Sequence, residues 1–176
     1  MPSISPLRLC ACFSLLAALL VACSPTFNWR EVPIGGTDLV ALLPCKAERA
    51  SRELPLGGEQ VAVEMAGCET GGATFAVAHA AARSTTQAEA WLVAWRAATR
   101  AQLAEAPAVE SAGTLARAAP VPAPVRLKTQ GDVALQVLWF AKARSDGTVA
   151  LYQATVLGQP SASDAADTFF DGLRLP

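Results

Sequence analysis

The sequence predicts an α+β fold: a single antiparallel β-sheet with two main helices packed on one face, preceded by a cleaved signal helix. Strand-like runs are joined by the glycine pairs Gly57-Gly58 and Gly71-Gly72, which favour tight antiparallel turns. A helical apolar stripe occupies the middle of the chain. An alternating hairpin and a second helical stripe follow it, so strands and helices come in separate runs, as in α+β proteins.

The strands before the middle helix are short and bounded by turn residues. We predict them over residues 39–43, 49–56, 60–65 and 73–80. In the third of these, Val61, Val63 and Met65 alternate with neighbours on the other side, which is typical of a strand with one buried face.

The middle helix begins in Ser84–Gln87 and ends near Ala106-Pro107. Thr86, with Glu89 three residues later, fits a capping box. Trp91 and Trp95 follow helical spacing with other apolar residues, and such a stripe more often belongs to a core than to a ligand site. We therefore predict core packing, and keep contact of Trp91, Trp95 and Trp139 with a ligand or partner as the alternative.

Residues 108–130 have the weakest pattern. Pro120, Pro122 and Pro124 interrupt their apolar positions, and proline cannot donate to a strand ladder. We predict an irregular loop with an edge strand at most, and place mobility or partner contact there. After it, 132–143 and 148–157 predict a hairpin, and a final helix begins at Ser161.

The N-terminus has the layout of a secretory signal. Arg8 precedes an apolar run from Leu9 to Ala22, which is shorter than the roughly 20 residues that span a membrane. Leu20-Val21-Ala22-Cys23 resembles a bacterial lipobox. This resemblance implies that residues 1–22 are a lipoprotein signal peptide and that Cys23 begins the mature chain, with a diacylglyceryl group on its sulfur and an acyl chain on its amine. The alternatives are a buried N-terminal helix and an unmodified cysteine.

The predicted layout of the mature chain is a lipidated tether over 23–37 and a periplasmic α+β domain over 38–176. The resemblance to lipoproteins implies an anchor in the bacterial envelope, and Ser24 after the cysteine favours the outer membrane, facing the periplasm. The tether nevertheless contains Trp29, which we expect to pack on the domain rather than to lie at the lipid headgroups.

Cysteine usage agrees with an oxidising compartment. Of five cysteines, two leave with the signal and Cys23 carries lipid, so that Cys45 and Cys68 remain. We predict a disulfide between them, worth roughly 3 kcal/mol in the chain-entropy model. The alternatives are a redox pair, or a metal site that recruits His79, and neither has a spacing motif.

Charge and motifs exclude several functional classes. The formal net charge is −1 and there is no basic stripe, so we expect no nucleic-acid partner. His79 is the only histidine and lacks a nucleophile motif, and the glycine pairs lack the lysine of a phosphate loop. We expect no enzymatic activity, no cofactor and no metal.

The mature domain resembles known proteins in three stretches. These are "ALLPCKAER", "AEAWLVAWRAATRAQ", and "LYQATVLG" leading into "AADTFFDGLRLP". It is similar to small proteobacterial lipoproteins of unknown function and, more distantly, to the PsbP-like α/β/α sandwich. The resemblance implies a fold and an envelope location, and transfers no active-site residues.

Two functions fit this sequence. The first is a lipid-anchored interaction or assembly module that docks on an envelope protein through its sheet face or the proline-rich loop. The alternative is a carrier or sensor of a small apolar ligand, held between sheet and helix near the three tryptophans. The apolar positions are accounted for by a core, which favours the first.

Overall fold

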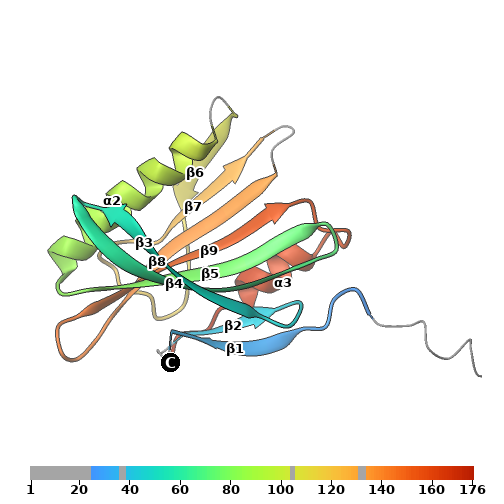
Figure 1. Ribbon diagram of the computed structural model, residues 1–176, viewed down its shortest axis with the longest axis horizontal. Helices are drawn as coiled ribbons and strands as arrows, with labels where there is room; N and C mark the ends of the chain where they lie inside the picture. Colours follow the sequence, from blue (N-terminus) through green and yellow to red (C-terminus); the bar gives the residue numbers. More distant parts are fainter. Residues whose placement is uncertain (1–24, 36–38, 104–105, 131–133) are drawn as a thin grey trace, which may run out of the picture.

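The computed structural model describes residues 25–35, 39–103, 106–130 and 134–176. Figure 1 labels its elements. The strands are β1 (Arg30–Ile34), β2 (Leu39–Leu43), β3 (Glu48–Leu56), β4 (Glu59–Thr70), β5 (Ala73–Ala82), β6 (Ala108–Ala112), β7 (Val125–Thr129), β8 (Leu135–Ala143) and β9 (Val149–Gly158). The helices are α2 (Thr85–Gln102) and α3 (Ala165–Asp171). The predicted signal peptide over 1–22 and the predicted lipid site Cys23 lie outside the described residues.

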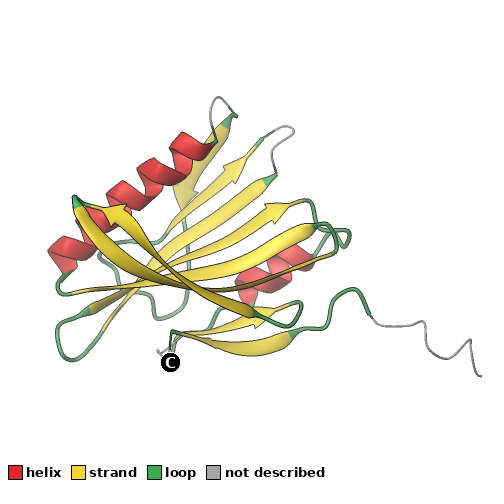
Figure 2. Ribbon diagram, viewed as in Figure 1, coloured by secondary structure: helices red, strands yellow, loops and turns green. Residues whose placement is uncertain are grey.

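The predicted single sheet with two main helices is wrong. The described residues are mostly β, with 49% in strands and 17% in helices, and the strands form two sheets (Figure 2). One sheet has seven strands in the order β3-β4-β5-β9-β8-β7-β6, and the other pairs β1 with β2. All pairs of neighbouring strands are antiparallel.

The path of the chain makes β5 and β9 the centre of the large sheet. Strands β3, β4 and β5 form a meander through the turns Gly57-Gly58 and Gly71-Gly72, as predicted, and all four glycines have positive φ. Helix α2 then carries the chain across the sheet to β6 at the far edge. From there β7, β8 and β9 return strand by strand until β9 pairs with β5.

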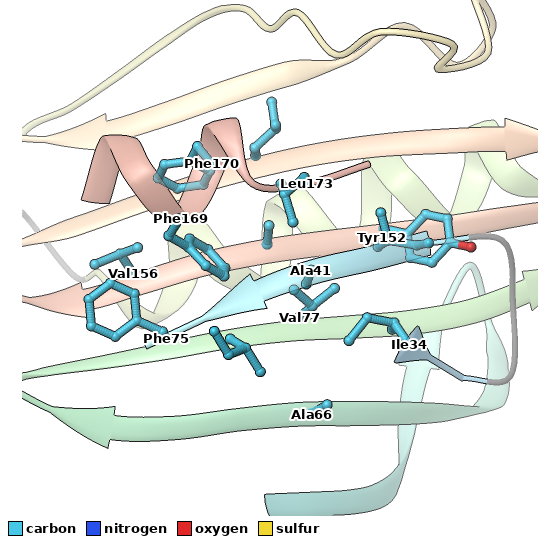
Figure 3. Packing of buried hydrophobic residues seen from close by; sticks show 14 of the residues in the cluster. Ile34, Ala41, Ala66, Phe75, Val77, Tyr152, Val156, Phe169, Phe170 and Leu173 are labelled. Atoms are coloured by element: carbon cyan, nitrogen blue, oxygen red, sulfur yellow. The ribbon is translucent and has the colours of Figure 1, made fainter. Parts of the chain in front are cut away.

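The two faces of the large sheet carry separate cores because successive strand residues point to opposite sides. On β5, Phe75 and Val77 belong to the core that α3 and the β1–β2 hairpin cover, which we call the α3-side core (Figure 3). Ala80 and Ala82 belong to the core under α2, the α2-side core. The helices therefore lie on opposite faces, and not on one face as predicted.

The apolar content of the predicted tether explains the second sheet. Residues 30–34 form β1 and pair with β2, and Ile34 is 1% exposed. Phe27 and Trp29 stack with ring centroids 6.1 Å apart and pack against the α3-side core. The prediction that Trp29 packs on the domain is confirmed. The hairpin covers sheet surface that the short helix α3 leaves open.

The region 108–130 contains two strands, β6 and β7, rather than one edge strand at most. Pro120, Pro122 and Pro124 lie in the connection between β6 and β7, so they do not interrupt the hydrogen bonds between these strands. Helix α2 also begins differently from the predicted capping box. Gln87 N–H donates to Ser84 Oγ at 3.2 Å, and Gln87 Oε1 accepts from the Arg83 N–H at 2.7 Å.

Candidate functional site

A groove lies between the C-terminal half of α2 and the large sheet. Its volume is about 660 Å³, within the range of small-molecule sites. Its walls come from one helix and five strands: Arg52, Leu54, Pro55 and Leu56 of β3, Val63 and Met65 of β4, Ala78 of β5, Trp95, Ala98, Thr99 and Gln102 of α2 with Leu103 after it, Leu135 and Val137 of β8, and Gln153, Thr155 and Leu157 of β9.

The groove exists because α2 carries large side chains first and small ones later. Trp91, Leu92 and Trp95 are about 95% buried and fill the space between the helix and the sheet. One turn further on, the groove-lining helix residues are Ala98 and Thr99. Ala98 and Thr99 are much smaller than the tryptophans, and only the Thr99 hydroxyl approaches the sheet, so the second half of the helix leaves space beneath it.

The floor of the groove combines apolar side chains with one polar cluster. Trp139 Nε1 donates to Gln153 Oε1 at 2.8 Å, and Gln153 Nε2 donates to Thr155 Oγ1 at 3.2 Å. Thr99 Oγ1 lies 3.4 Å from the same Gln153 oxygen and donates to Trp95 O at 3.0 Å. A few fixed polar groups in an apolar groove are typical of sites that orient a ligand.

Arg52 lies at the rim of the groove. It is exposed, and its register partner Val63 belongs to the α2-side core, so Arg52 shares that face of β3 with Leu56. Among the described residues that line the groove, it is the only charged one. The acid next to it, Glu53, points to the other face because strand residues alternate.

The three tryptophans singled out from the sequence have different positions. Trp95 lines the groove. Trp139 is completely buried and does not line the groove, but its indole N–H donates to Gln153 on the groove floor. Trp91 lies by the Gly57 turn, where an added Cβ would come within 3.0 Å of its ring, and it lines a different hollow.

Two arginines hold α2 on the sheet. Arg96 and Arg100 both bind the carboxylate of Glu110 on β6, and the Arg100 Nε to Glu110 Oε1 distance is 2.9 Å. Burial raises the pKa of Glu110, but the hydrogen bonds and positive charges of the two arginines outweigh it and leave that pKa below its usual value. These two ion pairs, which we call the Glu110 fork, hold α2 on the sheet. The second half of this helix covers the groove.

His79 lies on the α3 side of the sheet, away from the groove. It is 7% exposed, and its Nε2 is buried with no hydrogen-bond partner among the described residues. Its ring lies against Tyr152 with centroids 5.1 Å apart, and Glu64 faces it across the β4–β5 ladder. Burial lowers the pKa of His79, the Arg144 charge lowers it further, and the Glu64 charge raises it.

The predicted disulfide between Cys45 and Cys68 is confirmed. It connects the segment after β2 to β4, so it ties the β1–β2 hairpin to the large sheet. Both thiols are thereby consumed. Among residues that the structure describes, no group of three or more His, Cys, Asp or Glu side chains is placed to hold a metal ion.

No protein-family model matches the chain, and a search of curated proteins finds no match. None of the described helices has the length and apolar composition needed to cross a membrane.

Sequence reasoning missed Arg52, Gln153 and Thr155 as site residues. Gln153 stands out in the apolar run "LYQATVL", and a polar side chain in a central strand is a signal of a polar network or a ligand. Arg52 shares strand parity with Leu54 and Leu56, which places a cation on an apolar face. Neither signal predicts that a groove forms under the C-terminal half of α2.

Proposed function

We propose that the protein is a lipid-anchored protein of the bacterial envelope, held at the outer membrane through Cys23 and facing the periplasm. We further propose that its domain carries a small apolar ligand in the groove under α2. The lipobox-like Leu20–Cys23 stretch supports the anchor. The groove, with its apolar walls and its fixed polar floor at Gln153, supports the ligand.

Ligand binding has more structural support than docking through the proline-rich loop. Leu115 and Ala118 of that loop pack against the α3-side core. The Ala119 N–H donates to Ala141 O at 2.7 Å, and Ala119 itself is 6% exposed. The loop is thus attached to the domain, while the groove is open. Docking on an envelope protein remains the competing proposal.

The anchor is tested by the intact mass of membrane-extracted protein. The expected mass is that of a chain beginning at Cys23, plus a diacylglyceryl group and an acyl chain. A Cys23→Ser variant lacks the sulfur that accepts the diacylglyceryl group and should lose the added lipid mass. An unlipidated wild-type mass would contradict the anchor without affecting the groove.

The groove is tested on a soluble chain that spans residues 23–176 with Cys23→Ser. It keeps all described helices and strands, which lie within 25–176. The neutral apolar dye N-phenyl-1-naphthylamine should bind this chain and gain fluorescence. Ala98→Trp fills the groove and should weaken dye binding about tenfold or more. Ala97→Trp is the matched control, because Ala97 is exposed on the same helix and does not line the groove.

Equal dye binding by the Ala98→Trp and Ala97→Trp variants would contradict the carrier function. If neither the dye nor an extracted lipid binds, capture of an envelope protein by the wild-type chain would favour the competing docking function. Loss of that capture on deletion of residues 113–124 would then place the contact in the loop.

A further inference from the structure

We propose that the ligand of the groove is a single-chain amphiphile with an anionic head, and that Arg52 binds the head. This inference rests on the proposed function and adds the chemical class of the ligand. The head is a carboxylate, as in a fatty acid, or a phosphate monoester, as in a lysophosphatidate. Both are oxyanions that a guanidinium can bind through two parallel hydrogen bonds.

The walls of the groove select an apolar chain. Leu54, Val63, Leu135 and Val137 present only hydrocarbon to the groove, and Trp95 closes it on the helix side. Burying an acyl chain against such surfaces is favourable by about 25 cal/mol for each Å² removed from water. A compact polar molecule would gain little of this free energy.

The rim selects the sign of the head group. The guanidinium of Arg52 makes no ion pair and no hydrogen bond with another described residue, so its donors are available to a ligand. The described groove residues include no acid that would repel an anion. In contrast, the guanidinium groups of Arg96 and Arg100 on α2 both form ion pairs with Glu110.

The polar cluster of the floor limits the path that the apolar chain can take. The Gln153 amide is held by Trp139 on one side and Thr155 on the other, so it keeps one orientation. This cluster interrupts the apolar floor between Val137 and Leu157. An acyl chain that enters past Arg52 lies along Leu54, Val63 and Trp95 and leaves the amide satisfied by the protein.

The test compares ligands that share one tail and differ in the head. Dodecanoate, lauroyl lysophosphatidate and the neutral dodecanol displace N-phenyl-1-naphthylamine from the soluble chain, below their micelle concentrations. Either anion or both should bind about fivefold or more tightly than dodecanol at low salt. The tighter anion then identifies the head as carboxylate or phosphate.

Arg52→Gln should remove that preference and leave dodecanol binding unchanged. Arg52→Lys, which keeps the charge and loses the fork, should restore part of it. Arg49→Gln is the matched control, because Arg49 lies on the same strand and faces the opposite side of the sheet, where it donates to Pro33 O. It removes the same charge and should keep the preference.

The outcomes separate this inference from the proposed function. Equal binding of dodecanol and both anions, with loss of all three in Ala98→Trp, would overturn the anionic head and retain the carrier. An unchanged preference in Arg52→Gln would overturn the role of Arg52. Failure of both anions to displace the dye, or binding that Ala98→Trp leaves intact, would overturn the inference and the use of the groove together.

Discussion

Trp139 and Gln153 are direct partners in the β8–β9 ladder, and the indole N–H of one donates to the side-chain oxygen of the other at 2.8 Å. Trp139 is completely buried, whereas Gln153 is half-buried and lines the groove. One hydrogen bond thus connects the buried α2-side core to the floor of the proposed ligand site. The same bond fixes the Gln153 amide.

Replacing Gln153 with Leu should destabilise the protein by about 1–3 kcal/mol, because the buried indole N–H loses its acceptor. Urea denaturation of the soluble chain, followed by circular dichroism, measures the free energy of unfolding. Gln60→Leu, at an exposed strand position, is the control and should change it by less than about 0.5 kcal/mol. Equal stability of Gln153→Leu and wild type would mean that Trp139 finds another acceptor.

Removing the disulfide should cost about 3 kcal/mol, because Cys45 and Cys68 close a loop across a sequence separation of 23 in the unfolded chain. The measurement compares the urea stability of the soluble chain with that of the double variant Cys45→Ala, Cys68→Ala. Reductant should bring the wild type to the level of the double variant and leave the variant unchanged. A loss below about 1 kcal/mol would contradict the entropic account.

Local patterns predicted the parts of the fold that local chemistry decides. Strand β2 has the predicted bounds Leu39–Leu43, the glycine-pair turns join β3, β4 and β5, and the closing hairpin is β8–β9. The disulfide followed from counting cysteines. Each of these features depends on residues close in sequence or on the chemistry of one residue type.

The errors have long-range causes. Pro33 and Gly35 made residues 30–34 resemble a linker, but pairing with β2 and burial of Ile34 stabilise a strand there. The large sheet is covered on both faces because the β1–β2 hairpin packs with α3 on the face opposite α2. The groove likewise arises from small residues on α2 facing strands far away in the chain, which no local periodicity encodes.

The Glu110 fork predicts a coupled effect on stability and on the groove. Glu110→Gln should lower the free energy of unfolding by about 1 kcal/mol, since Arg96 and Arg100 lose a shared, mostly buried carboxylate. A helix held less firmly over the sheet should also weaken binding of N-phenyl-1-naphthylamine.

The control for Glu110→Gln is Glu53→Gln, which removes an exposed acid from β3, the other edge strand of the large sheet. That variant should change neither quantity appreciably. If Glu110→Gln lost stability but bound the dye as wild type does, the fork would stabilise the edge of the sheet without shaping the groove.

His79 predicts a pH dependence of stability with a definite sign. Its environment combines burial, the ring of Tyr152, and the opposing charges of Arg144 and Glu64. The pKa of His79 in the folded protein lies below its ordinary value of 6.5, so in the window between the two values the unfolded chain binds more protons. The free energy of unfolding should therefore be fully retained above pH 6.5 and fall as the pH drops below it, by at most about 1.4 kcal/mol per pH unit.

Because His79 is the only histidine, His79→Gln should remove this dependence between about pH 5 and pH 7. Glu64→Gln should strengthen it, since the Glu64 charge favours the protonated imidazole in the folded state. Urea denaturation across this range measures both slopes. The His79 ring is buried and its Nε2 has no hydrogen-bond partner among the described residues, so the fold accommodates the neutral ring. Protonation would add a positive charge that the Arg144 charge opposes. A slope in His79→Gln equal to that of the wild type would assign the acid sensitivity to carboxylates instead.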